Sequence, residues 1–394
     1  MGSTFDWKDP FHFTDQLSEE ERIAQDEIRA FCEKRLRPHL ETVHQNGFDP
    51  AIFREFGALG LLGMTIQGFG AAGAGYVTYG IVARELERVD AGYRGMLSVQ
   101  GSLVMNSIYH FGSEEQKAAY LPRLASGESI GCFGMTEPEH GSNPAGMETV
   151  ADEVPGGYRI SGQKMWISFS PVADLFVIWA KLRALGTGPS AVRGFIIPKG
   201  APGLEVRKVT DKVDLPNSTT GELMLRELFV PADHVLPKAT GLNGPLSTLS
   251  SARYGIAWGA LGSAEDCWMR SRDYAMERKP FGRALAETQL VQAKLATMQT
   301  DIALGLQGCL RVGRLLDEGR GTAEMISLVK RNSCQRALDI ARMARDIHGG
   351  NGLRRGYRIM HHMLNLEADI TYEGTHDIHS LVLGRSQTGL QAFY

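Results

Sequence analysis

The sequence predicts a mostly helical protein with a central β domain, because the type of pattern changes twice along the chain. Apolar residues recur with helical periodicity over residues 17–125. Short β-rich runs broken by glycine, proline and asparagine follow over 129–242, and long helical patterns resume at 246. The expected parts are an N-terminal α-helical domain (1–130), a middle β-barrel domain (131–240) and a C-terminal four-helix bundle (241–394).

The expected elements of the first part are helices. Ser18 to Glu21 form a capped helix start, and Pro38 is expected to end that helix. Further helices are expected over residues 52–62, 76–90, 98–111 and 116–125. The run Gly68–Gly73 matches the dinucleotide pattern GxGxxG, but a helical stretch precedes it and no parallel strand follows. We interpret this run as a loop between helices.

The middle and last parts differ in the length of their runs. Short strands that suggest an antiparallel barrel or sandwich are expected at 158–160, 165–167, 175–181, 194–198, 204–209 and 223–230. Helices that fit a bundle are expected at 248–277, 285–319, 322–348 and 357–369.

Composition narrows the class of protein. A chain of 394 residues with 43% apolar and 22% charged residues is expected to fold into two or three globular domains. The formal net charge of −3 argues against nucleic acid as a partner, but it allows a small phosphorylated cofactor held by a few arginines.

Cysteines and apolar runs indicate the environment. The five scattered cysteines form no metal-binding spacing, so we expect no metal and a reducing compartment. No run approaches the ~18 apolar residues of a membrane helix, and no Arg-rich transit peptide is visible at the N-terminus. The expected location is the cytoplasm of a bacterium, or the mitochondrial matrix of a eukaryote.

A carboxylate followed at once by glycine stands near the C-terminus, in Tyr372-Glu373-Gly374-Thr375. A helical pattern ends just before it and another begins just after it. Glycine allows a tight bend, and a desolvated carboxylate is a stronger base than one in water. The segment therefore suits a general base, although a helix-ending turn with an exposed glutamate gives the same pattern.

The run Tyr372–His379, with Leu383-Gly384-Arg385 after it, closely resembles the active-site segment of acyl-CoA dehydrogenases. Within that family it looks most like the glutaryl-CoA dehydrogenases, and the α, β, α order resembles the family layout over the whole chain. The resemblance implies that Glu373 removes the α-proton of an acyl thioester. It also implies substrate contacts for Tyr372, Gly374 and Phe393, and FAD contacts for Thr375 and Asp377.

The segment from Gly131 to Asn143 resembles the flavin segment of the family. The resemblance implies that Phe133, Met135 and Thr136 lie against the flavin ring, and that Ser142 contacts flavin or the thioester arm of CoA. An ordinary strand and turn with capping residues is the alternative.

A second flavin-like segment is Lys164 to Ser168. By resemblance, Trp166 stacks near the flavin and the Ser168 hydroxyl reaches its reactive nitrogen. A single tryptophan in a strand is otherwise most often a core residue.

Another group of residues suits the nucleotide part of a cofactor. A cation, a side-chain amide and a glycine bend can bind a pyrophosphate and an adenosine. The candidate residues are Arg278, Phe281, Gln289, Gly349 and Gly350. A helix C-cap explains the two glycines equally well. In the family these positions hold the FAD of a neighbouring subunit, so the resemblance implies a homotetramer.

Three charged residues bear on the substrate. Arg253 resembles a CoA-contacting arginine, although a helix-surface arginine is the alternative. Arg94 follows Gly-Tyr, where the resemblance places the cation that binds the far carboxylate of glutaryl-CoA, with Glu87 beside it. The alternative is a solvated charged helix.

The implied reaction is FAD-dependent α,β-dehydrogenation of glutaryl-CoA, with loss of CO₂ to give crotonyl-CoA and transfer of electrons to an electron-transfer flavoprotein. Departures from the family at Gly95, Asn143, Phe169 and Pro216 leave other functions open. These are a modified dicarboxylate carried by CoA or a carrier protein, desaturation without CO₂ loss, an oxidase that uses oxygen, and a flavin-free paralogue.

Overall fold

The computed structural model describes residues 5–392, without the side chains of 44–46. Helices at both ends of the chain and a β-sheet between them confirm the expected fold class. The chain divides into two compact units made from segments distant in sequence. The first contains residues 1–44, 75–94 and 253–394, and the second contains 45–74 and 95–252.

The first long helix begins where the sequence predicts. Helix α1 (Glu19–Phe31) has a capping box, in which Ser18 Oγ accepts the Glu21 N–H and the Glu21 carboxylate accepts the Ser18 N–H. The expected end at Pro38 is wrong, because a π-helical turn, η2 (Cys32–Leu36), leads directly into α2 (Arg37–Asn46). Pro38 directly follows this turn, where the i→i−5 spacing of the π-helical hydrogen bonds interrupts the regular α-helical ladder that a proline would break.

The remaining N-terminal helices follow the expected stretches except α5, which covers residues outside them, and the stretch expected at 98–111 begins with a π-helical turn. They are α3 (Ala51–Ala58), α4 (Tyr76–Glu87), α5 (Ala91–Leu97), η3 (Ser98–Met105), α6 (Asn106–Phe111) and α7 (Glu114–Ala125). The run Gly68–Gly73 lies in a loop between α3 and α4, which confirms that it is not a dinucleotide motif.

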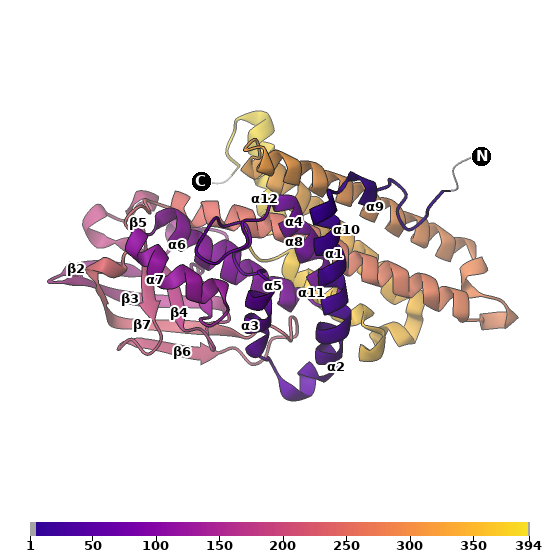
Figure 1. Ribbon diagram of the computed structural model, residues 1–394, viewed down its shortest axis with the longest axis horizontal. Coiled ribbons are helices and arrows are strands. Elements are labelled where there is room, and N and C mark those ends of the chain that lie inside the picture. Colours follow the sequence, from indigo (N-terminus) through magenta and orange to yellow (C-terminus); the bar gives the residue numbers. More distant parts are fainter. Residues whose placement is uncertain (1–4, 393–394) are drawn as a thin grey trace. The chain divides into compact units, whose positions relative to one another are not determined.

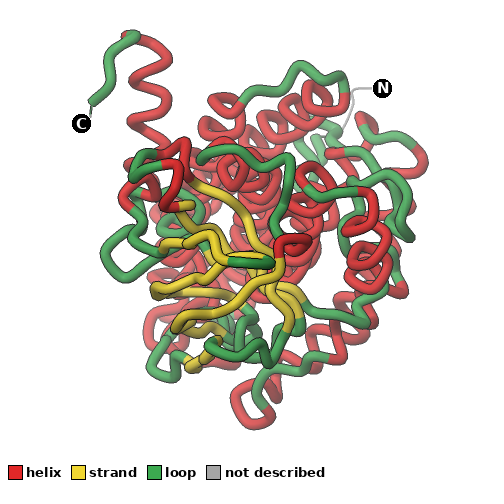
Figure 2. Tube along the Cα trace, turned by 90° about the vertical axis from the view of Figure 1, so that its left-hand side faces the viewer, coloured by secondary structure: helices red, strands yellow, loops and turns green. Residues whose placement is uncertain are grey.

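Seven strands form one curled sheet in the second unit (Figure 2). They are β1 (Gly131–Gly134), β2 (Val150–Val154), β3 (Gly157–Ser168), β4 (Leu175–Leu182), β5 (Val192–Pro198), β6 (Leu204–Lys208) and β7 (Thr220–Pro231). Their order is β1-β4-β2-β3-β7-β6, with β5 also paired to β4. The expectation of antiparallel pairing alone is wrong, because β1 and β2 both run parallel to β4.

Long helices make up most of the C-terminal part (Figure 1). They are α8 (Asn243–Glu277), α9 (Gln289–Asp317), α10 (Ala323–His348), α11 (Ile359–Asp369) and α12 (His376–Thr388). Helix α10 packs against α9, α11 and α12. This packing places the link between α11 and α12, which carries Glu373, against α10.

Helices α4 and α8 approach each other closely at two glycines. A Cβ at Gly80 would lie 2.4 Å from Trp258 Nε1, and a Cβ at Gly259 would lie 2.2 Å from Glu87 Oε2. Only glycine leaves room for these side chains. Gly259 thereby allows the Glu87 carboxylate to lie in the interior, against α8.

Two further features of the described chain concern its surroundings. None of its described helices combines the length and the apolar character that a bilayer crossing requires. All five cysteines are buried and none forms a disulfide.

Candidate active site

The link between α11 and α12 carries the predicted base on a strained bend. Glu373 has a φ of 53° and Gly374 has a φ of 91°. Thr375 Oγ1 accepts the Ile378 N–H at 3.2 Å, so this side chain caps α12. The tight bend predicted from the Glu-Gly pair is present.

A buried lysine and a partly buried arginine bind three successive carbonyls of this bend. Lys330 Nζ donates to the carbonyls of Tyr372 at 2.5 Å and Gly374 at 2.7 Å. Arg253 Nε donates to the Glu373 carbonyl at 2.7 Å. In a trans peptide the N–H points opposite to the preceding carbonyl, so the Glu373 N–H points away from Lys330. Within residues 5–392 that N–H has no backbone acceptor.

One oxygen of the Glu373 carboxyl group is shielded from solvent. Its Oε2 is buried and has no hydrogen-bond partner in the described part of the chain. Burial raises the pKa of Glu373, while the positive charges of Arg94, Lys330 and Arg253 oppose that rise. A carboxylate oxygen that lacks donors and water binds a proton more strongly than an exposed one, as a general base requires.

Arg94 lies in a buried ionic cluster in the same unit as Glu373. Its side chain is 2% exposed, and it donates from Nε to Glu87 at 2.8 Å and from Nη2 to Asp369 at 3.0 Å. The Tyr372 hydroxyl contacts both Arg94 and Asp369. The solvated charged helix that the pattern of residues 84–94 also allowed is therefore excluded.

One cation in this cluster faces two carboxylates. Burial and the neighbouring Asp369 raise the pKa of Glu87 well above its usual range, against the opposing charge of Arg94. A proton held on Glu87 leaves the cluster of Arg94, Glu87 and Asp369 electrically neutral. Sequence reasoning found Arg94 and Glu87 but missed Asp369, whose contact with Arg94 joins residues that are 275 positions apart.

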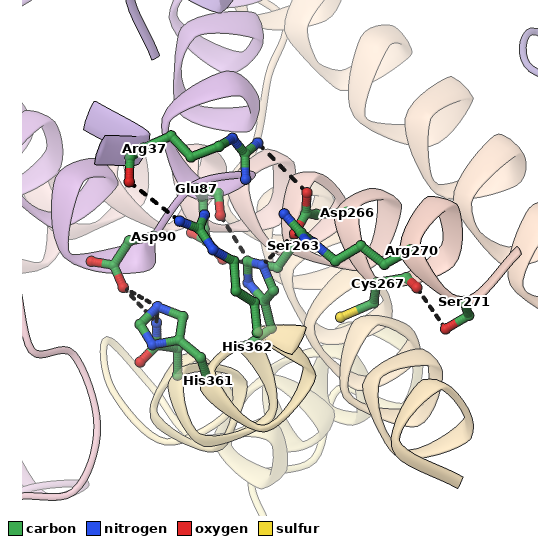
Figure 3. Close-up of polar contacts among 12 residues, drawn as sticks. Arg37, Glu87, Asp90, Ser263, Asp266, Cys267, Arg270, Ser271, His361 and His362 are labelled. Carbon is green, nitrogen blue, oxygen red and sulfur yellow. Dashed lines mark hydrogen bonds and ion pairs between the residues drawn. The ribbon is translucent and has the colours of Figure 1, made fainter. Parts of the chain in front are cut away.

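Two adjacent histidines anchor α11 (Figure 3). His361 Nε2 lies 2.7 Å from Asp90 Oδ2, and His362 Nε2 lies 3.0 Å from Asp266 Oδ2 on α8. Burial alone would raise the pKa of Asp266, but hydrogen bonds from His362 and Arg270 lower it below its usual range. These pairs hold the N-terminal half of α11 and so position Asp369 at its other end.

A buried ion pair organises the predicted flavin segment in the second unit. Lys164 Nζ lies 2.8 Å from Glu137 Oε1 and donates to the Met135 carbonyl at 3.1 Å. The Glu137 carboxylate also accepts the N–H groups of Glu148 and Thr149. Burial lowers the pKa of Lys164 to about 8, against the attraction of Glu137. Lys164 and Glu137 thus hold Met135 and Thr136 against β3, a role that sequence reasoning missed.

Trp166 lies in an irregular part of β3. The pairing of β3 with β7 shifts register between Lys164 and Ile167, and Trp166 has a φ of 61°. Its side chain is 56% exposed, so the core position allowed by sequence reasoning is wrong for this residue. A bulge of this kind redirects a side chain out of the regular alternation of a strand.

Comparison with known proteins gives the family. The N-terminal, middle and C-terminal domain models of acyl-CoA dehydrogenases match residues 18–128, 132–228 and 239–388. A probable acyl-CoA dehydrogenase of Bacillus subtilis (strain 168) is 32% identical over 94% of this chain and 98% of its own length. The chain belongs to the acyl-CoA dehydrogenase family.

Solved structures of other acyl-CoA dehydrogenases match the whole fold. A glutaryl-CoA dehydrogenase from Mycobacterium smegmatis in complex with FADH2 has 41% identity and a TM-score of 0.96, over 99% of this chain and 100% of that one. Butyryl-CoA dehydrogenase from Megasphaera elsdenii has 29% identity and a TM-score of 0.89, over 94% and 98%. The resemblance and the fold inferred from the sequence are confirmed.

The FADH2 in that relative implies a flavin cofactor for this acyl-CoA dehydrogenase, and the second unit has side chains that fit one. The exposed Trp166 ring offers a flat apolar face. The hydroxyls of Thr136, Ser142 and Ser168 are not engaged by other described residues. Phe133 and Met135 are each 8% exposed beside them. A ring system with polar edges matches this set.

The residues expected to hold the nucleotide gather only in part. Arg278, Gly349 and Gly350 line one open hollow of about 410 Å³ together with Tyr274 and His348. Gly349 also ends α10 with a φ of 55°, so the C-cap interpretation is confirmed alongside the hollow. Phe281 and Gln289 lie outside its lining, and both are exposed.

The remaining predicted residues have simpler places. Arg253 binds the Glu373 carbonyl, and its expected contact with CoA stays a prediction. Asp377 is exposed in the first turn of α12. Phe393 lies outside the described residues. Of the unexpected contributors, Lys330 had no sequence signal, because its partners are backbone carbonyls.

Proposed function

We propose that this acyl-CoA dehydrogenase performs FAD-dependent α,β-dehydrogenation of an acyl thioester with Glu373 as its general base. The observation that carries the proposal is the Glu373 Oε2 atom, which is buried without a partner on a bend held by Lys330 and Arg253. No hydrogen-bond donor of the described chain occupies this oxygen, so it is available to accept a proton. Structural cores rarely retain such an unpaired acceptor.

The backbone beside the base supplies the second requirement of the reaction. Removing an α-proton places negative charge on the thioester oxygen, which must be stabilised by preorganised donors worth about 3 kcal/mol each. The Glu373 N–H, directed away from Lys330 and without a backbone acceptor, is such a donor. Lys330 therefore positions both the base and the proposed oxyanion donor.

The second unit supports the oxidative half of the proposal. When bound, FAD supplies a hydride acceptor for the β-carbon of the substrate. Trp166 would stack on one side of the flavin, while Thr136 and Ser168 would donate hydrogen bonds to its polar edge. Ser142 is proposed to contact flavin or the thioester arm, and electrons would leave to an electron-transfer flavoprotein.

The substrate that we propose first is a glutaryl thioester. Arg94 is a buried cation in the same cluster as Tyr372, the residue before the base, and a relative with 41% identity is named a glutaryl-CoA dehydrogenase. After dehydrogenation, the bond from the γ-carbon to the far carboxylate breaks, and its electron pair enters the enoyl thioester as CO₂ leaves. Glu373 then returns its proton to the γ-carbon, which gives crotonyl-CoA.

A second candidate is dehydrogenation of an acyl thioester without a far carboxylate and without CO₂ loss. The observation in its favour is that Glu87 and Asp369 already balance the Arg94 charge. A substrate carboxylate would have to replace Asp369 as the Arg94 partner. The two candidates share the base and the flavin, and they differ only in the acyl group.

Anaerobic mixing of the purified holoenzyme with acyl-CoA substrates tests both candidates. Bleaching of the flavin by glutaryl-CoA, with crotonyl-CoA and CO₂ as products, supports the first. Bleaching by butyryl-CoA alone supports the second. Glutaconyl-CoA as product would instead show dehydrogenation of a glutaryl thioester without CO₂ loss. A colourless protein, or a flavin that no acyl-CoA reduces, would overturn the dehydrogenase proposal, and peroxide formed in air would reveal an oxidase.

We also propose a homotetramer in which the hollow at Arg278 and Gly349 receives the nucleotide end of the FAD of a neighbouring subunit. The full exposure of Phe281, whose φ is 57°, supports this. A strained backbone that exposes an apolar ring to solvent is expected where a partner subunit covers that ring.

We also propose a reducing compartment, either bacterial cytoplasm or the mitochondrial matrix. The five buried cysteines, none of which forms a disulfide, support this proposal.

A further inference from the structure

A fully buried lysine lies inside the second unit, next to the residues proposed to contact the flavin. Lys164 belongs to β3, and the residue paired with it on β7 is the buried Leu223. Lysine side chains are rarely buried completely unless charged or polar groups pair with them. The partners of Lys164 therefore indicate what its burial achieves.

The ammonium group of Lys164 has two partners, and these stand on either side of Thr136 in the sequence. Lys164 Nζ donates to the Met135 carbonyl at 3.1 Å and lies 2.8 Å from Glu137 Oε1. The Glu137 carboxylate is itself held in place, because it also accepts the Thr149 N–H at 3.0 Å. Lys164 thus binds the backbone just before Thr136 and the side chain just after it.

The next residues of β3 complete this arrangement. The Met165 N–H donates to the Thr136 carbonyl at 2.9 Å, so β3 binds the carbonyl oxygens of both peptide units that flank the Thr136 Cα. Trp166 follows at the register shift between β3 and β7, with its ring exposed. Thr136 and Trp166 are both proposed to contact the flavin, and one segment of β3, Lys164–Trp166, positions them together.

The Thr136 N–H belongs to the same peptide unit as the carbonyl that Lys164 binds. In a trans peptide these two groups point in opposite directions, so this N–H points away from the ammonium group. No backbone carbonyl of the described chain accepts a hydrogen bond from it, and Thr136 is only half-buried. A donor bound to the carbonyl polarises the peptide unit and strengthens its N–H as a donor.

Burial increases the effect of the Lys164 charge on its surroundings. A charge that is excluded from water acts through a medium of low dielectric, where it is screened much less than at the surface. Hydrogen bonds and charges near the ring of a flavin are among the means by which a protein tunes the electronics of that cofactor. Lys164 is therefore placed to act on a bound flavin through the peptide it polarises.

We propose that Lys164 is a positioning residue that raises the reduction potential of the bound flavin through the Met135–Thr136 peptide. The Thr136 N–H donates to the polar edge of the ring, and this donation stabilises the reduced, more electron-rich flavin more than the oxidised one. Glu137 holds the ammonium group in its place. The inference rests on the flavin site proposed above, and Lys164 acts on the flavin without contacting it.

The midpoint potential of the flavin in the purified holoenzyme, measured by anaerobic titration against a reference dye, tests this role. Lys164→Met keeps an unbranched side chain but removes the charge. We expect its potential to lie about 30 mV below that of the wild type, which for a two-electron couple corresponds to a tenfold weaker preference for reduced flavin. Lys199→Met is the control, because it removes a lysine that pairs with Asp174 at the surface, and its potential should equal the wild-type value.

A double variant separates the change in potential from damage to the fold. Lys164→Met alone leaves the Glu137 carboxylate buried without its cation, which is destabilising. Lys164→Met combined with Glu137→Gln leaves no uncompensated charge, so this protein should fold and bind FAD. Its flavin potential should also lie below that of the wild type.

The possible results separate this inference from the proposed function. An unshifted potential in the FAD-bound double variant would overturn the inference, because Lys164 would then have a purely structural role. If an acyl-CoA still bleaches that flavin, the proposed dehydrogenation is unaffected. A wild-type protein that binds no flavin would overturn both.

Discussion

A single carboxyl oxygen accounts for the chemistry proposed for this acyl-CoA dehydrogenase. Glu373 Oε2 is buried without a donor, while the backbone on both sides of it is held by Lys330 and Arg253. The side chain is thus left free for a proton, and only its backbone is restrained. Mutations at this scale should separate chemistry from folding.

Glu373→Gln should retain flavin but lose turnover by a factor of about 10²–10⁴, because the amide cannot accept the proton.

The same variant should also change the pH dependence of stability. Burial raises the Glu373 pKa, so ionisation of this group opposes folding as the pH rises through that value. The variant should therefore be more stable than the wild type near neutral pH, and this difference should vanish in acid. Chemical unfolding at several pH values, with turnover assays, checks both; an active variant would place the base elsewhere.

The pH profile should report the same carboxyl group. Its raised pKa means that kcat/KM falls on acidification at a pH above the ordinary value of 4.5 for a glutamate. Lys330→Met removes a positive charge that lowers this pKa, so its acid limb should move to higher pH. A lower kcat with an unmoved acid limb would show that Lys330 has a purely structural role.

Asp369 should control whether Arg94 can bind the far carboxylate of the substrate. Asp369→Asn removes the carboxylate that pairs with Arg94 Nη2, so this edge of the guanidinium becomes available to a substrate carboxylate. We expect kcat/KM for glutaryl-CoA to rise about tenfold relative to butyryl-CoA, which corresponds to ~1.4 kcal/mol. An unchanged ratio in steady-state assays would mean that Arg94 does not contact the acyl group.

At the scale of elements, helix contacts set the position of the ionic cluster. Helix α4 supplies Glu87, α11 supplies Asp369, and the close approach of α4 and α8 depends on Gly259. The histidine pairs at Asp90 and Asp266 hold α11 from its other end. The positions of the charged groups in the cluster therefore depend on how these three helices pack.

Gly259→Ala should destabilise the protein by about 1–3 kcal/mol, because its Cβ would meet Glu87 Oε2 at 2.2 Å. Gly308→Ala on α9 is the matched control, since its nearest contact would be Val329 at 3.8 Å. That control should be neutral, or more stable by up to about 1 kcal/mol, through helix propensity. Thermal and chemical unfolding of both variants check the difference, and equal midpoints would contradict it.

At the scale of the whole molecule, the proposed assembly depends on exposed residues between α8 and α9. Phe281 is fully exposed and Arg278 stands beside the hollow at Gly349. If a neighbouring subunit covers Phe281, a charge there should disrupt the assembly and the cofactor together.

Phe281→Asp should lower both the oligomeric state and the flavin content, because burying a carboxylate in a subunit interface is costly. Val213→Asp, at another exposed apolar position, serves as control. Sedimentation velocity and the flavin-to-protein absorbance ratio measure the two effects. A tetramer that keeps its FAD would show that Phe281 lies outside the interface.

The sequence by itself determined the order of helical and β parts, the bend at Glu373 and the loop at Gly68–Gly73. These follow from local chemistry: apolar periodicity, and glycines that permit a positive φ. The prediction that the first helix ends at Pro38 was wrong, because a π-helical turn forms just before it. The parallel pairing of β1 and of β2 with β4 was also missed, because the sequence of a strand does not show which strand it pairs with.

Only the tertiary structure decided which charges meet. Asp369 against Arg94, Lys330 beneath the Glu373 bend and Lys164 against Glu137 join residues far apart in sequence, or join side chains to backbone carbonyls. Neither kind of contact leaves a periodic pattern, because a pattern records which face of an element is buried and not which partner it meets. The exposed Trp166 depends likewise on a register shift between two strands.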